Sequence, residues 1–178
     1  MSEEVADKPG SGPKLRCDPL TPAFRVVLVE PEIPQNTGSI ARTCAATNTP
    51  LHLVGKLGFR IDEHAVRRAG LDYWHLVDLH THPDLDDFTA KHPTSRLHLF
   101  APSATRSYLV GDWQPGDALV FGKESVGLDA AILAKYPETT WGIPMSGGVR
   151  SLNVSNSVAI VLFEALRGAG GLDSVALR

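Results

Sequence analysis

The 178-residue sequence has few cysteines and no long apolar segment, and these two shortages narrow its class. Its two cysteines, Cys17 and Cys44, have no metal or redox spacing, which favours free thiols in a reducing compartment. No apolar run approaches the roughly 18–20 residues of a membrane span. The N-terminus also lacks the basic start and apolar middle of a signal peptide. We therefore expect a cytoplasmic protein without a membrane span.

The sequence has no large excess of positive or negative charge, and it lacks the common catalytic and metal-binding motifs. The formal net charge is −3, so any RNA contact has to come from a local basic patch. The sequence contains no G-x-G-x-x-G, H-E-x-x-H, C-x-x-C or G-x-S-x-G pattern, and G-K-E-S at 122–125 lacks the glycine and hydroxyl spacing of a P-loop. His80 and His82 could share one face of a strand. Without a third ligand in view, a surface role is favoured and no metal is predicted.

What the sequence does have is a segment near its C-terminus that turns from polar to apolar. Hydroxyl and amide side chains cluster at 151–157, and a near-continuous apolar run follows at 158–163. Such a run fits a buried strand or a buried helix. Asn153 or Ser155 as N-cap and Gly168 past the end favour the helix. A helix this apolar has to be buried, in a core or against a partner chain.

Short apolar segments alternate with helical segments through the rest of the chain. The expected strands cover 24–29, 51–54, 76–79, 97–100, 118–121 and 140–143. The expected helices run from Asn36 or Thr37 to about Thr47, over 62–69, 84–90 and 129–135, and from the C-terminal cap to Arg167. This alternation predicts an α/β fold with a mostly parallel sheet and helices on both faces. Residues 1–22 are expected to be a disordered tail, 23–170 a single domain and 171–178 a C-terminal tail.

Three loops rich in glycine, proline, asparagine or serine each follow an expected strand. They cover residues 30–38, 122–128 and 143–153. Because an open α/β sheet binds its ligand beyond the carboxyl ends of its strands, these loops predict the ligand site. The pattern fits a nucleotide-like ligand about as well as many others.

A small set of basic residues with one aromatic could contact RNA. Its members are Arg42, Arg67, Arg68, Arg150 and Tyr73. Guanidinium groups beside an aromatic ring suit phosphate and base contacts. The alternative is an ordinary solvated helix face.

Three segments together resemble the motifs of the SPOUT superfamily of RNA 2′-O-ribose methyltransferases. They are E-P-E-I-P-Q-N-T-G-S-I-A-R (30–42), F-G-K-E-S-V-G-L (121–128) and I-P-M-S-G-G-V-R-S-L-N-V-S-N-S (143–157). With R-R-A-G-L-D-Y (67–73) added, the sequence is most similar to the small TrmL type. The likeness covers residues 24 to about 170. Enzymes of the TrmL type methylate the ribose of the wobble nucleotide, cytidine or uridine, in certain tRNAs.

The resemblance implies a fold, a cofactor, a partner and a set of site residues. The fold is an α/β domain whose C-terminal segment forms a deep trefoil knot, and the knot helix and first helix join a homodimer. The cofactor is S-adenosylmethionine, in a pocket lined by Phe100, Gly122, Ile143 and Ser151. The matching catalytic residues are Arg42, Asn36, Glu124, Ser151 and Asn153. The RNA-binding residues are Arg67, Arg68, Tyr73 and Arg150.

Among these residues we favour Arg42 as the catalytic arginine. A guanidinium is effectively always protonated, so its expected role is to hold a phosphate and stabilise the developing alkoxide rather than to act as a base. Asn36 and Asn153 could instead be plain helix caps. The alternatives to the wobble position are another tRNA position, rRNA, or a non-catalytic RNA-binding protein on the same fold.

Overall fold

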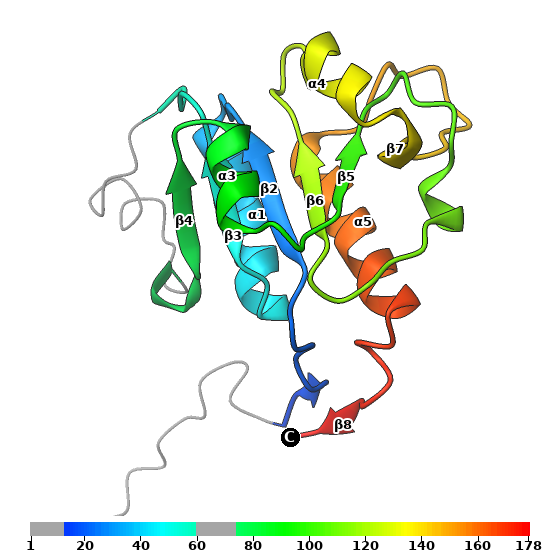
Figure 1. The fold of residues 1–178 in the computed structure, drawn as a ribbon. Helices are drawn as coiled ribbons and strands as arrows, with labels where there is room; N and C mark the ends of the chain where they lie inside the picture. Colours follow the sequence, from blue (N-terminus) through cyan, green and yellow to red (C-terminus); the bar gives the residue numbers. More distant parts are fainter. Residues whose placement is uncertain (1–12, 60–73) are drawn as a thin grey trace, which may run out of the picture.

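The computed structural model of the chain describes residues 13–59 and 74–178, and these residues form a parallel sheet with helices on both faces (Figure 1). Six strands hydrogen-bond in the order β4-β3-β2-β6-β5-β7, and every neighbouring pair is parallel. In that order they cover Leu79–His82, Leu51–Val54, Arg25–Val29, Ala118–Phe121, Leu97–Phe100 and Thr140–Trp141. The predicted α/β class is confirmed.

Strand β2 shows why the central strands read as unbroken apolar runs. Val26 and Leu28 pack in the core under helices α1 (Pro34–Thr47) and α5 (Val154–Gly168). The alternate residues of the strand, such as Val27, pack on the opposite face with Phe88 of α3 (Leu85–Lys91). The short helix α4 (Ala130–Lys135) covers the same face through Ile132 and Leu133. Because both faces are covered, both sets of alternating side chains have to be apolar.

Most element boundaries match the sequence prediction, and two strands do not. The third strand was expected at 76–79 but lies at 79–82, because a 3₁₀ helix, η1, occupies Trp74–Leu76. Strand β7 ends at Trp141 rather than at 143. Two further 3₁₀ helices cover Tyr108–Val110 (η2) and Pro137–Thr139 (η3). The helix expected at 62–69 lies outside the described residues.

Helix α1 begins earlier than its predicted caps. Pro34 takes its first position, where a fixed φ is favourable and the missing N–H costs nothing, and Ile33 precedes it without a side-chain cap. Asn36 therefore lies inside the first turn, and the prediction that it or Thr37 caps the helix is wrong. The predicted end is confirmed, since Asn48 adopts the left-handed conformation with a φ of 55°.

Helix α5 begins as the sequence predicts. The Asn153 side chain accepts a hydrogen bond from the backbone N–H of Ser155, which identifies it as the N-cap. At the other end Gly168 is the last helical residue rather than the first beyond it, and Ala169 is the C-cap. No helix in the described segments is both long and apolar enough to cross a bilayer.

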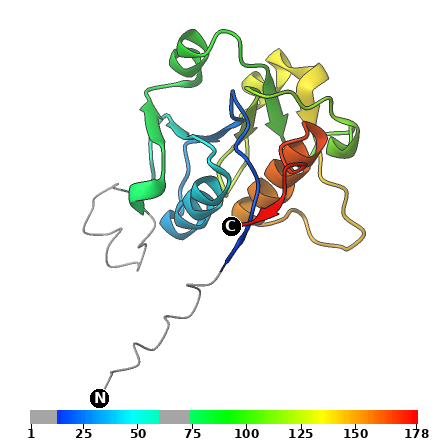
Figure 2. The same cartoon turned by 90° about the horizontal axis from the view of Figure 1, so that it is seen from below.

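The two ends of the described chain pair with each other, which departs from the predicted tails. Strand β1 (Leu15–Arg16) runs antiparallel to β8 (Ala176–Leu177), and Figure 2 shows these two strands side by side near the label C. An ion pair of 2.9 Å between Arg178 and Asp18 adds to the backbone hydrogen bonds. Composition alone does not reveal this pairing, because it joins segments from opposite ends of the sequence. Residues 1–12 lie outside the described part.

The expected surface role of the histidine pair is wrong for one of them. His80 is exposed, but His82 is only 6% exposed and lies against His52 of β3. The parallel register sets His52 beside His80 and Val54 beside His82, so the histidines share the face that α3 covers. Burial chiefly, with the neighbouring histidines, lowers the pKa of His52 to about 3.

Candidate active site

A cavity of about 550 Å³ lies at the carboxyl ends of β5, β6 and β7. The sheet order changes direction between β2 and β6, since β3 and β4 extend to one side and β5 and β7 to the other. Ligands in open α/β sheets bind at such a switch point, where the loops after neighbouring strands separate. All three predicted loops contribute to the cavity, through Ile33, residues 122–127 and residues 150–153.

Most of the predicted site residues line this cavity. They are Phe100, Gly122, Ile143, Ser151, Asn36, Glu124, Asn153 and Arg150. Arg42 is not among the lining residues; it lies exposed on α1. Arg67, Arg68 and Tyr73 lie outside the described residues. The fold therefore unites the predicted cofactor residues with four of the five predicted catalytic residues.

The Glu124 carboxylate joins the loop after β6 to the beginning of α1. It accepts hydrogen bonds from the backbone N–H groups of Glu32, at 2.8 Å, and Ile33, at 3.2 Å. Glu32 forms a reciprocal hydrogen bond, since its carboxylate accepts from the backbone N–H of Ser125 at 3.0 Å. Glu124 thus takes the place of the missing side-chain cap, at the helix end where negative charge is favoured.

Two asparagines extend this contact to α5, and their amide orientations follow from their partners. Asn36 Nδ2 donates to Glu124 Oε1 at 3.0 Å, which leaves Asn36 Oδ1 to accept from Asn153 Nδ2 at 3.0 Å. Asn153 Oδ1 then accepts from Ser155 N at 2.9 Å. A carboxylate only accepts and a backbone N–H only donates, so both ends of the chain fix the same arrangement. We call Glu124, Asn36, Asn153 and Ser155 the cavity network.

The charge of Glu124 is set by opposing influences. Burial raises the pKa of this carboxyl group, but hydrogen bonds from Glu32 N, the Asn36 side chain and Ile33 N outweigh it, and the net pKa is lowered. The group is therefore ionised at neutral pH, and its acceptor positions are committed to α1. Such a carboxylate is a weak proton acceptor, so its geometry indicates a positioning role.

Gly122 is required by the protein's own backbone. A Cβ at this position would lie 2.2 Å from the carbonyl carbon of Gly127 and 2.3 Å from the nitrogen of Leu128. The loop doubles back there, since Lys123 and Gly127 exchange two backbone hydrogen bonds. The missing side chain of Gly122 therefore lets the loop close on itself beside the cavity.

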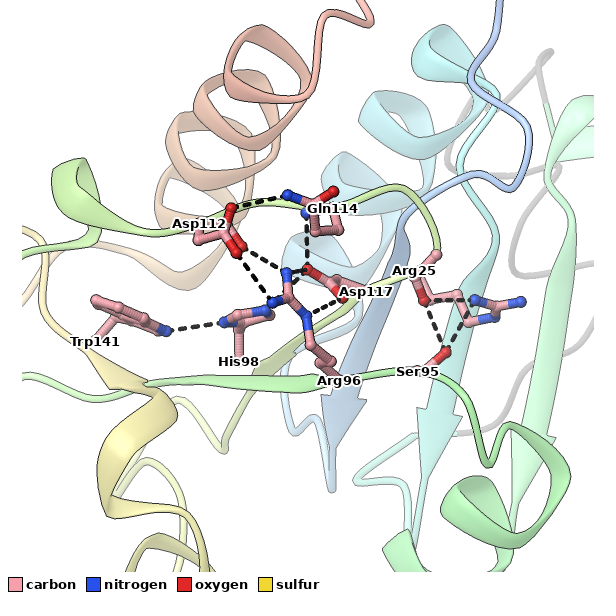
Figure 3. A network of polar contacts seen from close by, with 9 residues as sticks. Arg25, Ser95, Arg96, His98, Asp112, Gln114, Asp117 and Trp141 are labelled. Atoms are coloured by element: carbon pink, nitrogen blue, oxygen red, sulfur yellow. Dashed lines mark hydrogen bonds and ion pairs between the residues drawn. The ribbon is translucent and has the colours of Figure 1, made fainter.

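Aromatic side chains form the apolar wall of the cavity. Phe100 and Phe121 stack with ring centroids 4.8 Å apart, and Trp141 is only 4% exposed. The indole N–H of Trp141 donates to His98 Nδ1 at 3.0 Å, and His98 Nε2 lies 3.0 Å from Asp117 Oδ2 (Figure 3). Because Trp141 is only a donor, the proton of His98 is on Nε2 and points to the carboxylate. Sequence patterns did not single out this support.

Arg96 completes what we call the buried network, which comprises Arg96, His98, Asp117 and Trp141. Arg96 donates to both oxygens of Asp117, at 2.9 and 2.7 Å (Figure 3). Burial would raise the pKa of Asp117, but the hydrogen bonds from His98, Arg96 and Gln114 N outweigh it and lower the pKa to about 2. The network therefore holds the indole of Trp141 with a fixed, ionised group.

A parallel sheet with three glycine-containing loops around one cavity is typical of a ligand-binding α/β protein. Comparison with known proteins identifies the family. The chain belongs to the SpoU rRNA Methylase family, whose model matches residues 23–163. The predicted superfamily is thereby confirmed.

Named relatives are similar over most of the chain. A tRNA (cytidine(34)-2′-O)-methyltransferase from Burkholderia pseudomallei is 47% identical over 150 residues, covering 83% of this chain and 96% of the relative. A solved structure that reports on 2-OH methylation of C/U34 on tRNA is 43% identical, with a TM-score of 0.77, and covers 83% of this chain and 97% of that one. An AdoMet-bound rRNA methyltransferase from Sinorhizobium meliloti is 25% identical, with a TM-score of 0.70, over 85% of this chain and 61% of that one.

Proposed function

We propose that this protein transfers a methyl group from S-adenosylmethionine to the ribose 2′-hydroxyl of the wobble nucleotide, cytidine or uridine, of tRNA. The observation that carries the proposal is the cavity network, which joins the motif residues of three distant segments beside one cavity. The 47% identity to a tRNA cytidine(34) enzyme supports the substrate. We place the reaction in the cytoplasm, and the two free cysteines support that location.

The residues of the cavity suit S-adenosylmethionine. Its volume lies within the roughly 300–1,000 Å³ of small-molecule sites. The aromatic wall and Ile143 suit an adenine ring, and the hydroxyl and amide groups of Ser151 and Asn153 suit the polar parts of the ligand. When bound, S-adenosylmethionine supplies a methyl group activated by its positive sulfur, so the protein's task is alignment.

Each catalytic residue has a proposed role that follows from its contacts. Glu124, Asn36 and Asn153 hold the first turns of α1 and α5 at fixed positions around the cavity. Ser151 faces the cavity at the loop's end. Arg42 stabilises the developing alkoxide and holds the adjacent phosphate, and the proton leaves to water or a neighbouring group. Arg67, Arg68, Tyr73 and Arg150 contact the RNA.

The proposal includes the trefoil knot, which the family implies, and a homodimer through α1 and α5. Ile160 and Phe163 are 39% and 48% exposed and lie on one side of α5, being three residues apart. In the rest of the apolar run Val158, Val161 and Leu162 are buried and Ala159 is half-buried. An exposed apolar stripe beside α1 supports burial against a second copy. A Phe163→Glu variant should lower the mass measured by light scattering to that of a monomer, whereas Lys135→Glu, an exposed position of α4 on the opposite face of the sheet, should not.

A dimer would also explain why Arg42 lies outside the cavity of its own chain. If Arg42 acts on the partner's cavity, the variants Arg42→Ala and Asn153→Ala should each lose most turnover. Co-expression of the two would restore part of the activity, because mixed dimers contain one intact site. No restoration would assign Arg42 to its own chain's substrate.

The deciding experiment is a methyl-transfer assay with the purified full chain. We expect labelled methyl groups to enter tRNA transcripts with cytidine or uridine at the wobble position, and transfer to disappear when that single ribose is replaced by a 2′-deoxyribose. Transfer that survives the replacement would favour another tRNA position. Transfer only to rRNA would overturn the tRNA assignment. Absence of S-adenosylmethionine binding in calorimetry would favour a non-catalytic RNA-binding protein.

A further inference from the structure

Three histidines from separate elements meet under α3, on the face of the sheet that α1 and α5 do not cover. They are His52 of β3, His82 of β4 and His92, the C-cap residue of α3. One ring nitrogen from each lies within 4.8 Å of the others. All three rings pack around Phe88, at centroid distances of 5.0, 5.3 and 4.8 Å. None of them lines the cavity described above. We call them the histidine cluster.

The proton positions in this cluster follow from Asp87. His82 Nδ1 lies 2.8 Å from Asp87 Oδ2, and Asp87 is also paired with Lys91 at 2.9 Å. The Asp87 carboxylate accepts at both contacts, since the Lys91 ammonium group can only donate. His82 therefore carries its proton on Nδ1 and presents a lone pair at Nε2. His52 Nδ1 lies 3.0 Å from that lone pair and donates to it.

This chain of hydrogen bonds is incomplete at its inner end. With its proton on Nδ1, His52 has a lone pair at Nε2, and this atom is buried without a hydrogen-bond partner. His52 as a whole is 1% exposed. An unpaired buried nitrogen costs free energy, and this one is able to take up the His52 proton when a ligand displaces that proton from Nδ1. His80 stacks on His52 at 4.8 Å and is paired with Asp78, so it completes the packing.

We propose that the histidine cluster binds a divalent transition-metal ion, of which Zn²⁺ is the best match. Such ions prefer imidazole nitrogens to carboxylate oxygens as ligands. Asp87 behind His82 matches the carboxylate–histidine pairing that orients a metal ligand through its second nitrogen. The ion takes the place of the proton between His52 Nδ1 and His82 Nε2, and that proton moves to the unpaired Nε2 of His52, so the neutral ring binds the ion without net proton release.

The geometry requires a modest closure. Tetrahedral ligands at Zn–N bonds of about 2.05 Å are roughly 3.3 Å apart. The His52–His82 pair at 3.0 Å is near this separation, and His92 has to approach by up to about 1.5 Å. His92 is half-buried at the end of a helix, where a rotamer change disturbs little packing, and water supplies the fourth ligand from its open side.

The surrounding charges limit the affinity. Two cations, Arg25 and Lys91, face the cluster and disfavour a metal ion. Arg25 is held away by Ser95 Oγ at 3.0 Å and the Gly116 carbonyl at 2.7 Å, and Lys91 is neutralised by Asp87. We therefore expect stoichiometric binding at micromolar rather than picomolar concentrations. Binding would tie β4, the edge strand of the sheet, to β3 and α3.

Zinc titration of the full chain, stripped of metal with a chelator, tests the proposal. We expect one Zn²⁺ per chain by competition with a chromogenic chelator and no net proton release in weakly buffered solution at neutral pH, because the ligands are neutral imidazoles. With Zn²⁺ at about 100 times the dissociation constant, the melting temperature should rise by roughly 5–10 °C. Cobalt(II) should give the visible absorption of a tetrahedral site.

Variants separate the cluster from adventitious histidine binding. His92→Ala removes the most exposed ligand and should abolish the zinc-dependent rise in melting temperature while the metal-free chain stays folded by circular dichroism. Asp87→Asn should weaken binding about 10–100-fold, because the supporting carboxylate is lost. The matched control is His75→Ala, which removes an exposed histidine outside the cluster and should bind zinc like the unaltered protein. Absence of zinc binding would overturn the proposal. Binding that persists in His92→Ala, or that disappears in His75→Ala, would also overturn it.

Discussion

Strand β6 carries a polar network at each end, and the two networks differ in exposure and charge. At its amino end, Asp117 is 3% exposed and pairs with Arg96 and His98. At its carboxyl end, the Glu124 carboxylate binds backbone N–H groups and an amide, with no cationic side chain among these partners. The buried network supports the cavity wall from behind, whereas the cavity network faces the ligand. A carboxylate therefore serves stability at one end of the strand and positioning at the other.

The largest effect on stability should come from Asp117→Asn. This change leaves His98, whose side chain is 3% exposed, facing a neutral amide, whereas the Arg96 side chain is 44% exposed and partly hydrated. Losing hydrogen bonds to a buried charge costs about 2 kcal/mol, or roughly 4–8 °C in melting temperature. Urea unfolding followed by circular dichroism measures it. Asp112→Asn is the matched control, since Asp112 also contacts Arg96 but its side chain is 77% exposed. Its cost should stay below about 1 kcal/mol; equal costs would contradict the contrast.

Glu124→Gln should reverse the pattern and affect catalysis more than folding. A glutamine turns its NH₂ group toward donors that need an acceptor, so the first turn of α1 shifts. Small misplacements of this kind cost roughly 100-fold in turnover, and the lost hydrogen bonds about 1–2 kcal/mol. Methyl-transfer kinetics and melting curves on the same preparation separate the two effects. Glu32→Gln is the control, because its remaining oxygen still accepts from Ser125 N; a variant as inactive as Glu124→Gln would refute the assignment.

Acid should act through the buried network. The pKa of Asp117 is lowered from its ordinary 3.8 to about 2 in the folded chain. A carboxyl group with a lowered folded-state pKa stabilises the fold above its unfolded pKa and loses that contribution as the pH falls. Between about pH 4 and pH 2, stability should therefore fall more steeply in the unaltered protein than in Asp117→Asn. Parallel slopes in urea titrations at these pH values would exclude Asp117 as the source.

The smallest effect compares two tryptophans. Trp141→Phe keeps an aromatic wall but removes the donor to His98, which should cost about 1 kcal/mol and weaken S-adenosylmethionine binding several-fold. Trp113→Phe is the counterpart, because the buried Trp113 indole nitrogen has no hydrogen-bond partner among the described residues. This substitution loses similar area without losing a hydrogen bond, so it should cost less. Calorimetry and thermal melts rank the two variants, and a larger cost for Trp113 would reverse our interpretation.

Sequence patterns predicted the sheet well because its strands are buried on both faces. Runs such as V-V-L-V at 26–29 can be recognised without knowing their partner strands, since every side chain along them is apolar. The edge strand at Leu79–His82 was misplaced because its pattern contains two histidines, one exposed and one buried. Its identity as a strand depends on pairing with β3 rather than on local composition.

The sequence by itself determined the α/β class, a helix cap at Asn153 or Ser155 and the three motif loops, because apolar periodicity, capping chemistry and glycine-rich turns are local properties. The tertiary structure alone decided that Glu124 caps a helix 90 residues earlier in the chain, which is visible only from its hydrogen bonds to Glu32 and Ile33. It also decided that His52, His82 and His92 meet. Such contacts join residues that sheet order and helix packing bring together, and no local pattern records that order.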